Sequence, residues 1–299
     1  MKDKKVIFMG TPLFAVGVLE KLIEYTTVVA VVTQRDKEVG RKKILTPSAV
    51  KKIALENNIK VLTPDRIRDS IDEINSIDCD IIVTCAYGQI IPEEILYHPK
   101  YKTINVHASL LPKYRGGAPI QRAIMDGCDI TGVTIMFTDK GMDTGNIISK
   151  KEINININDD IISLNDKLSM LGAELLIETL PSIFDGTCCN IKQDDSLSSI
   201  ARLITRDDEE LNFDDDAINV YNKIRALSNI GAYVKLNDFN MKIFKAEIGD
   251  KSSLEPGCVT MDKSIRISTR TKDIIVLELQ IPGKKRMLAK DYLNGKKTK

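Results

Sequence analysis

Short continuous apolar runs alternate with segments of helical periodicity through the first half of the chain, and this alternation restricts the fold more than any other feature. The apolar runs have the length of strands buried on both faces, and they lie at residues 5–10, 28–34, 80–86 and 103–108. Apolar residues at helical spacing lie between them, at 14–25, at 47–55 and after Pro92. The pattern predicts an α/β domain with a mostly parallel sheet.

Two more strands and a long helix complete this part of the chain. Residues 131–138 and 146–155 read as a strand pair joined by a glycine-rich loop, and residues 161–180 have the spacing of a long helix. Residues 185–199 are polar and lack any period, which is typical of a linker.

From about residue 206 the pattern changes to one helix, at 216–227, and several short strands separated by turns. Short strands with frequent turns favour a small β-barrel or sandwich. We therefore predict two domains, at residues 1–190 and 206–299, joined by a linker at 191–205.

Composition excludes several classes of protein. The apolar fraction of 43% and the charged fraction of 28% are those of a soluble globular chain. The net charge of +1 provides no global attraction to nucleic acid, so such a partner would require a local basic patch. The apolar run Val6–Met9 is too short for a signal peptide, and no run approaches the roughly 18 apolar residues of a membrane span.

The six cysteines form no CxxC pair, which fits free thiols in a reducing cytoplasm. Because the chain has only two histidines, its composition argues against a zinc site.

One of those histidines lies at the end of a predicted strand. Asn105 and His107 are two residues apart, so their side chains leave the same face of the strand. Ligands of open α/β sheets bind outside the carboxyl ends of strands, and an imidazole beside a carboxamide could stabilise a developing oxyanion. Spacing alone supports this interpretation and an ordinary packing role equally.

A second candidate is the loop TDKGMDTG at residues 138–145, which contains Asp139 and Asp143. A carboxylate on this loop could pair with His107 and favour its charged form. The alternative is an aspartate that serves only the turn, which is the commoner case.

These segments together strongly resemble the methionyl-tRNA formyltransferase family. The resemblance is carried by INVHASLLPKYRGGAPIQRAIMDG at 104–127 and by TGVTIMFTDKGMDTGNII at 131–148. It extends to FMGTPLFAVGVLEKL at 8–22, AYGQIIP at 86–92 and PGKKRMLAKDYLNG at 282–295.

The resemblance implies a Rossmann-like formyltransferase domain followed by a smaller, OB-like β-barrel that helps to bind tRNA. It implies transfer of the formyl group of 10-formyltetrahydrofolate, used as a co-substrate without a metal, to methionine on initiator tRNA. We further expect the protein to be a cytoplasmic enzyme and a monomer.

By the same resemblance, Asn105, His107 and Asp143 match the catalytic residues of the family. The residues that match its folate-binding segments are Ser109, Leu110, Leu111, Pro112, Tyr87, Gly88, Gln89, Ile90, Ile91, Asp139, Lys140, Gly141 and Met142.

Two basic clusters are candidates for tRNA contact. Residues 35–43 carry five basic and two acidic side chains. They resemble a loop that the family inserts at the acceptor end of tRNA. Residues 284–299 carry seven basic side chains and one acidic side chain. The predicted contact residues are Arg35, Lys37, Arg41, Lys42, Lys43, Arg202, Arg206, Lys284, Lys285 and Arg286. A solvated charge run is the alternative for both clusters.

The chain departs from the family pattern in its second half. It reads IRALSNIGAYVKL at 224–236, without the Asn-Pro-Trp-Pro segment of the family, and its stretch at 207–216 is acidic and would repel phosphate if it faced the tRNA. These differences affect how tRNA is held and leave the catalytic residues intact.

Other acceptors and other classes compete with this interpretation. Glycinamide ribonucleotide or an amino-sugar nucleotide could replace tRNA, and water as acceptor would give a hydrolase. A nucleotide-binding module without catalysis is disfavoured because GTPLFA at 10–15 lacks the GxGxxG pattern. A non-catalytic RNA-binding protein would leave Asn105, His107 and Asp143 unexplained.

Overall fold

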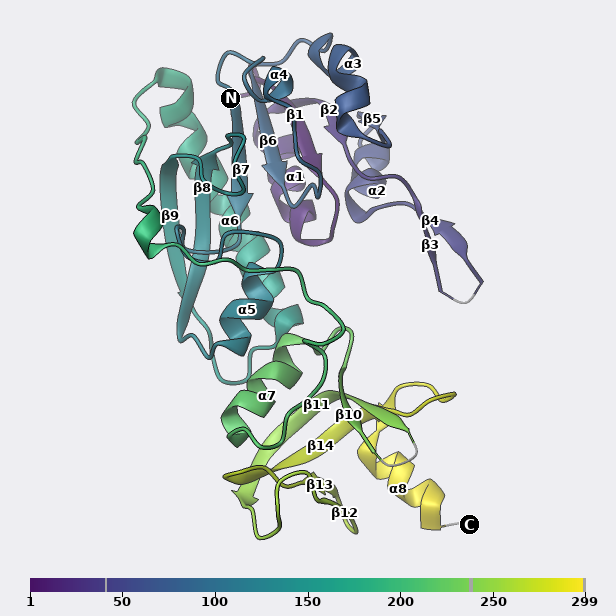
Figure 1. The fold of residues 1–299 in the computed structure, drawn as a ribbon. Coiled ribbons are helices and arrows are strands. Elements are labelled where there is room, and N and C mark those ends of the chain that lie inside the picture. The colour runs from purple at the N-terminus through teal and green to yellow at the C-terminus, as the bar shows by residue number, and fades with distance from the viewer. Residues whose placement is uncertain (41, 237–238, 298–299) are drawn as a thin grey trace. The chain divides into compact units, whose positions relative to one another are not determined.

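The computed structural model describes residues 1–40, 42–236 and 239–297 and divides into two compact units (Figure 1). The first unit consists of Met1–Pro119, Thr131–Ile153 and Asn165–Ala201. The second unit takes two inner segments, Ile120–Ile130 and Asn154–Leu164, together with the chain from Arg202 onward.

A mixed, mostly parallel sheet forms the centre of the first unit, in the order β5-β2-β1-β6-β7-β8-β9. Its strands are β1 (Lys5–Gly10), β2 (Thr27–Val32), β5 (Lys60–Leu62), β6 (Ile81–Cys85), β7 (Thr103–His107), β8 (Ile130–Phe137) and β9 (Ile147–Asn154). The pairs from β5 to β7 are parallel, and β8 runs antiparallel to β7. This confirms the predicted α/β class and mostly parallel sheet.

Helices connect these strands. They are α1 (Phe14–Tyr25), α2 (Ala49–Glu56), α3 (Ile71–Asn75), α4 (Glu93–Leu96), α5 (Pro119–Met125) and α6 (Ile161–Asp185), with single 3-10 turns at Ile67–Ser70 and Asp195–Leu197. Helices α1, α2, α4 and α6 follow the predicted order, whereas α3 and α5 were not predicted. Helix α6 runs five residues beyond its predicted end because Ile183, in its last turn, still has a buried side chain.

A short hairpin was not predicted. Strands β3 (Lys37–Val39) and β4 (Ile44–Thr46) pair antiparallel, with Lys37 opposite Thr46. Their side chains are mostly exposed, so they lack the alternation of apolar and polar residues that marks a half-buried strand.

The second unit is built on an antiparallel half-barrel sheet in the order β10-β11-β14-β13-β12, with β15 paired to β14. Its elements are α7 (Ala217–Ala226), β10 (Ala232–Lys235), β11 (Asn240–Lys251), β12 (Val259–Met261), β13 (Ile265–Ile267), β14 (Lys272–Gln280), β15 (Met287–Leu288) and α8 (Ala289–Lys297). Apolar faces of α7, α8 and the sheet form one core cluster. The prediction of a small second domain of short strands is confirmed.

A buried arginine attaches the inner segment Asn154–Leu164 to the second unit. The guanidinium of Arg225, on α7, donates to the carbonyl oxygens of Asp159 at 2.8 Å and Asn156 at 3.2 Å. It also donates to the side chain of Asn222 at 2.9 Å. Burial lowers the pKa of Arg225, and the carbonyl dipoles compensate part of the cost of burying its charge.

Close contact between β8 and β9 yields a stability prediction at Gly132. A β-carbon at Gly132 would lie 2.3 Å from the backbone oxygen of Lys151, so Gly132→Ala forces the two strands apart. We expect the free energy of unfolding to fall by about 2–3 kcal/mol, as for other overpacked sites, measured by denaturant titration. Gly295→Ala, at a helical site with open space around it, is the control and should stabilise slightly. Equal effects of the two changes would contradict the steric argument.

Candidate active site

The candidate site begins at the carboxyl end of β7. Parallel pairing places Asn105 opposite Thr84 of β6, and the Thr84 hydroxyl lies 2.9 Å from Asn105 Oδ1 as a donor. Because this bond occupies the amide oxygen, the Asn105 Nδ2 hydrogens are directed elsewhere. The neighbouring strand therefore fixes the orientation of the Asn105 amide.

Asp143 comes from the β8–β9 loop and faces both side chains of β7. Its Oδ1 lies 3.4 Å from Asn105 Nδ2, and its Oδ2 lies 3.6 Å from His107 Nδ1. The backbone N–H of Gly116 donates to the same Oδ2 at 2.7 Å. The structure thus brings together the three residues that match the family's catalytic residues.

Both ring nitrogens of His107 face oxygen atoms. Nδ1 faces Asp143, and Nε2 lies 2.9 Å from the backbone oxygen of Tyr114. His107 is buried, with 6% of its surface exposed, so these oxygens replace water as its partners.

Sterics require the glycine of the motif Asp143-Thr144-Gly145. A β-carbon at Gly145 would lie 1.7 Å from the backbone oxygen of Phe137, so only glycine permits this approach of the loop to β8. Asp143 itself has φ of +54°, a left-handed conformation that aspartate tolerates better than most residues.

Asp139 has a separate structural role in the same loop. Its Oδ1 accepts from the N–H of Gly141 at 3.0 Å and from the hydroxyl of Thr144 at 2.7 Å. Asp139 thus folds the loop, while Asp143 is the carboxylate that faces β7. Lys140, Gly141 and Met142 are exposed between them.

The segment Ser109–Pro112 follows β7 and is held tightly to the sheet. The hydroxyl of Thr134 donates to the backbone oxygen of Ser109 at 2.7 Å and accepts from the N–H of Leu111 at 3.1 Å. Leu111 is fully buried against Met136 and Ile147. Leu110 and Pro112 are half-buried.

Residues Tyr87–Ile91 follow β6 and therefore leave the same edge of the sheet as His107. The backbone oxygen of Tyr87 accepts from Thr11 Oγ1 at 3.0 Å and from Gln34 Nε2 at 3.1 Å. Gly88, with φ of +87°, lies against Gln34, and a β-carbon there would come within 2.5 Å of the Gln34 amide.

Side chains in this segment point in different directions. The Tyr87 ring packs into the core, and its hydroxyl is buried with no partner among the described residues. Gln89 Oε1 accepts from the N–H of Ile67 at 2.9 Å. Ile90 is 87% exposed, and Ile91 is half-buried.

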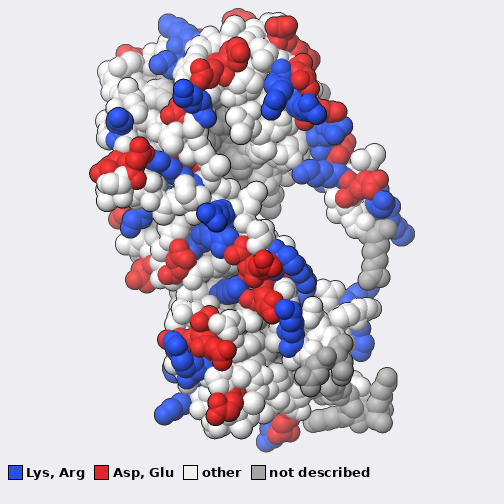
Figure 2. Space-filling model, viewed as in Figure 1, with Lys and Arg blue, Asp and Glu red and all other residues white. Residues whose placement is uncertain are grey.

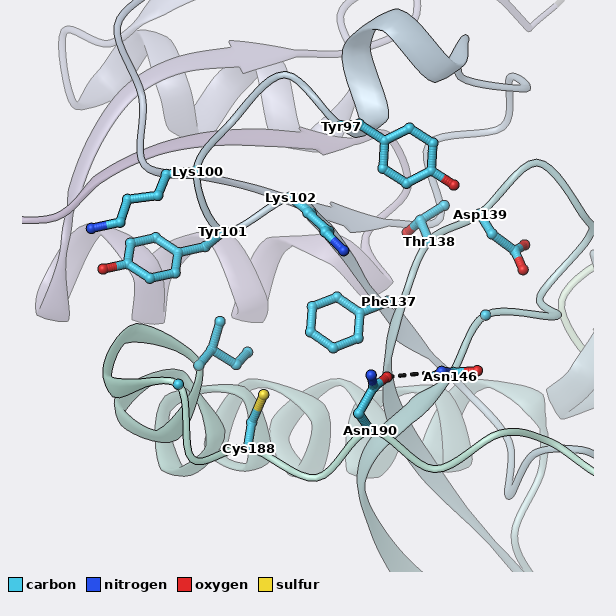
Figure 3. Close-up of a pocket in the computed structure, with 13 residues that line it drawn as sticks. Tyr97, Lys100, Tyr101, Lys102, Phe137, Thr138, Asp139, Asn146, Cys188 and Asn190 are labelled. Atoms are coloured by element: carbon cyan, nitrogen blue, oxygen red, sulfur yellow. Dashed lines mark hydrogen bonds between the residues drawn. The ribbon is translucent and has the colours of Figure 1, made fainter.

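A cavity of about 430 Å³ lies on the flank of the Asp143 loop (Figure 3). It is lined by Tyr97, Lys100, Tyr101, Lys102, Phe137, Thr138, Asp139, Gly145, Asn146, Ile183, Gly186, Cys188 and Asn190. Figure 3 shows the Asn146 and Asn190 amides bonded to each other, at 2.9 Å. Of the residues predicted for catalysis or folate binding, only Asp139 lines this cavity.

The predicted tRNA residues of the first unit lie on and beside the β3–β4 hairpin. Lys37, Lys42 and Lys43 are exposed there, and Lys43 lies 3.5 Å from Glu38. Arg35 pairs with Asp65 at 2.7 Å, and Arg41 lies outside the described residues. On the face drawn in Figure 2, basic and acidic side chains are interspersed.

Two of the predicted arginines of the second unit already have partners. Arg206 pairs with Glu209 and lies 4.2 Å above the Tyr233 ring. Arg286 donates to Glu278 at 2.5 Å, which raises the pKa of Arg286. Arg202, Lys284 and Lys285 are exposed.

Part of the acidic stretch at 207–216 is paired with basic side chains of the same unit. Asp208 accepts two bonds from Arg122, each 2.8 Å long, and these bonds hold the pKa of Asp208 far below its ordinary value. Glu210 pairs with Lys235 at 2.8 Å. These contacts reduce the field that the stretch would present to a phosphate.

One buried residue of the site was missed by sequence reasoning. Gln193 lies in the stretch interpreted as a linker, yet only 6% of its surface is exposed and its amide contacts the backbone of the Asp143 loop. No periodicity or motif marks it, because its partners lie about 50 and 80 residues earlier in the chain.

The described part of the chain holds no cluster of three or more His, Cys, Asp or Glu that could bind a metal. Within the same residues, no helix is both long and apolar enough to span a bilayer.

Comparison with known proteins identifies the family of both parts of the chain. Residues 4–180 match the formyl transferase family, and residues 203–297 match the formyl transferase C-terminal domain. The methionyl-tRNA formyltransferase of Staphylococcus aureus is 47% identical over 298 residues, which cover 97% of this chain and 96% of that protein.

Two solved structures share the fold. The N-formyltransferase from Helicobacter canadensis, in complex with folinic acid and dTDP-3-aminofucose, superposes with a TM-score of 0.70 at 25% identity, covering 91% of this chain and 98% of that one. The methionyl-tRNA formyltransferase from Clostridium thermocellum gives a TM-score of 0.57 at 18% identity, covering 82% and 93%.

The fold, the strand-end site and the match over both units define the class of this protein as a formyltransferase. The identity to the staphylococcal relative extends over almost the whole length of both chains. The chain therefore belongs to the methionyl-tRNA formyltransferase family, which confirms the family predicted from its motifs.

The buried Tyr87 hydroxyl yields a prediction about how the stability of the protein depends on pH. Burial raises the pKa of Tyr87 to about 12, above the value of about 10 for an unfolded tyrosine. The native state therefore retains this proton longer than the unfolded state. Ionisation of the unfolded state alone lowers the free energy of unfolding as the pH rises from about 10 towards 12.

We expect Tyr87→Phe to be about 1 kcal/mol more stable than wild type at pH 8, since it removes an unpartnered hydroxyl. At pH 11 the gap should widen by about 1.4 kcal/mol, measured by urea unfolding at both pH values. Tyr25→Phe, at an exposed ring, is the matched control and should show no widening. A constant gap for Tyr87→Phe would rule out the buried hydroxyl as the source.

Proposed function

We propose that this chain transfers the formyl group of 10-formyltetrahydrofolate to the α-amino group of methionine on initiator tRNA. The observation that carries the proposal is the cluster of Asn105, His107 and Asp143 at the end of β7, in a chain of this family. A carboxamide, an imidazole and a carboxylate at one strand end suit acyl transfer to an amine.

In the proposed reaction, the methionyl nitrogen attacks the formyl carbon and a new carbon–nitrogen bond forms. The carbonyl oxygen becomes an oxyanion, to which Asn105 Nδ2 donates a hydrogen bond and His107 Nε2 donates a second once it leaves the backbone oxygen of Tyr114. The bond from the carbon to the folate nitrogen then breaks, and the proton lost by the amine passes to that nitrogen.

Asp143 orients this pair of donors. Its carboxylate faces both of them, at 3.4 Å from Asn105 Nδ2 and 3.6 Å from His107 Nδ1. A carboxylate in this position can accept a hydrogen bond from His107 Nδ1–H and so determine which ring nitrogen is directed to the reacting groups.

The folate co-substrate is proposed to bind beside this cluster, between the segments Tyr87–Ile91, Ser109–Pro112 and Asp139–Met142. Support comes from parallel pairing, which makes the first two segments leave one edge of the sheet, and from the glycine-dependent loop that carries the third. The donor class is that of the formyl transferase family, and the H. canadensis relative was solved with folinic acid.

The tRNA is proposed to contact Arg35, Arg41 and the lysines of the β3–β4 hairpin in the first unit, and basic residues of the second. In the second unit, Lys284, Lys285 and Arg202 are exposed, whereas Arg206 and Arg286 would contact phosphate only by sharing or leaving their present acidic partners. The chain is proposed to act as a monomer in the cytoplasm, which its six free cysteines suit.

The decisive experiment compares acceptors. Formyl transfer from 10-formyltetrahydrofolate is measured with charged initiator Met-tRNA, charged elongator Met-tRNA, uncharged initiator tRNA and a dTDP-amino sugar. We expect rapid transfer to the charged initiator only. Transfer to the sugar nucleotide, without transfer to any aminoacyl-tRNA, would replace the proposal with the chemistry of the H. canadensis relative.

Removing an oxyanion donor should lower the rate of the chemical step. We expect Asn105→Ala to lower kcat about 100-fold to 1,000-fold, because one oxyanion donor is commonly worth that factor, with little change in KM. Asp143→Ala should lower kcat at least as much. Asp72→Ala, an exposed acid in α3, is the matched control. Near wild-type turnover of either site variant at saturating substrates would falsify the assignment.

Charge on the hairpin should appear in the salt dependence of tRNA binding. We expect the double change of Lys42 and Lys43 to alanine to weaken binding of initiator Met-tRNA about tenfold at low salt. The slope of log K against log salt should become shallower by about 1 to 2, since two phosphate contacts are lost. Lys52 and Lys60, exposed outside the hairpin, are changed to alanine as the control. An unchanged slope would show that the hairpin lysines are only solvated.

A further inference from the structure

Gln193 connects the loop that carries Asp143 to a buried arginine. Its Nε2 donates to the backbone oxygens of Asp143 and Gly145, both at 2.8 Å. Its Oε1 accepts from Arg115 Nε at 3.0 Å and from Arg115 Nη2 at 2.8 Å. Both amide hydrogens and both lone pairs of the amide oxygen are therefore used.

This pattern sets the conformation of the loop. Asp143 has φ of +54°, an uncommon conformation for a residue other than glycine, and the two carbonyl groups on either side of Thr144 point at one amide nitrogen. An amide that could flip without losing its hydrogen bonds would not hold this loop conformation. Gln193 is 94% buried, and its hydrogen bonds are satisfied in only one orientation of the amide.

The same network reaches the carboxylate of Asp143 by a second route. Arg115 is buried, and its backbone pairs with Ser199 and Ala201 at 2.8 and 2.7 Å. The next residue, Gly116, donates its N–H to Asp143 Oδ2 at 2.7 Å. Gln193 therefore holds the backbone of Asp143 directly. Through Arg115 it also anchors the segment whose Gly116 N–H holds the Asp143 carboxylate.

We infer that Gln193 is a positioning residue for the reaction: it places the Asp143 carboxylate against Asn105 and His107 without touching the substrates. This inference rests on the proposed function, because it assigns Gln193 to the same three side chains. Gln193 lies in a stretch whose sequence is otherwise typical of a linker, and the inference gives that stretch a role in the chemistry.

Gln193→Glu is the sharpest variant because it retains the size of the side chain and its acceptor for Arg115. It replaces the two N–H donors by a carboxylate oxygen that repels the carbonyl oxygens of Asp143 and Gly145. We expect kcat for formyl transfer to fall at least tenfold, with KM for both substrates changed less than threefold, because small misplacements at a reacting site cost about that much or more. Lys192→Gln, the exposed neighbour, is the control and should retain wild-type kcat.

A double-mutant cycle separates positioning from general damage. In the background of Asp143→Asn, the further change Gln193→Glu should lower kcat less than twofold, since the residue through which it acts is already impaired. If Gln193→Glu lowers kcat by the same factor in both backgrounds, its effect does not pass through Asp143 and the inference is overturned. If Asp143→Asn alone has wild-type kcat, the proposed function fails instead.

A spectroscopic readout keeps the test independent of activity. The chain has two histidines, and His98 is exposed while His107 faces Asp143. In a folded Gln193→Glu protein, NMR of the imidazole groups should show shifted resonances for His107 and unmoved resonances for His98. Unmoved His107 resonances in Gln193→Glu would overturn the positioning role, whatever the value of kcat.

Discussion

The carboxylate of Asp143 is the contact on which the rest of the site depends. It faces both Asn105 and His107, and it reaches them from a loop between two other strands. That reach requires a left-handed residue at 143 and no side chain at 145, where a β-carbon would meet the Phe137 oxygen at 1.7 Å. The motif Asp-Thr-Gly is therefore a backbone requirement as much as a chemical one.

Most strands of the sheet could be predicted from the sequence because their signals are local, whereas the three-residue strand β5 was not predicted. Runs such as Lys5–Gly10 and Ile81–Cys85 are continuous and apolar, and a strand buried on both faces needs nothing else to be recognised. Asn105 and His107 were placed on one face by the period of a strand. The hairpin at Lys37–Thr46 was missed because its exposed residues carry no apolar alternation.

Gln193 could not be predicted for a different physical reason. Its partners are backbone oxygens and a guanidinium contributed by distant segments, and such contacts leave no periodic trace in the residues around it. A polar stretch has the composition of a linker in both cases, whether it is exposed to solvent or folded against a site. The distinction depends on burial, which reaches 94% for Gln193 while its neighbours Lys192 and Asp194 are exposed.

A count of basic residues is a poor measure of what a tRNA would meet on this protein. Arg122, Arg206 and Arg286 are each bonded to an acidic side chain, and a phosphate would have to compete with that partner. In the acidic stretch at 207–216, Asp208, Glu209 and Glu210 pair with basic residues of their own unit, whereas Asp214 and Asp215 are exposed. Exposed lysines would make phosphate contacts at less cost, since a lysine in water loses only its hydration and some rotamer freedom on binding.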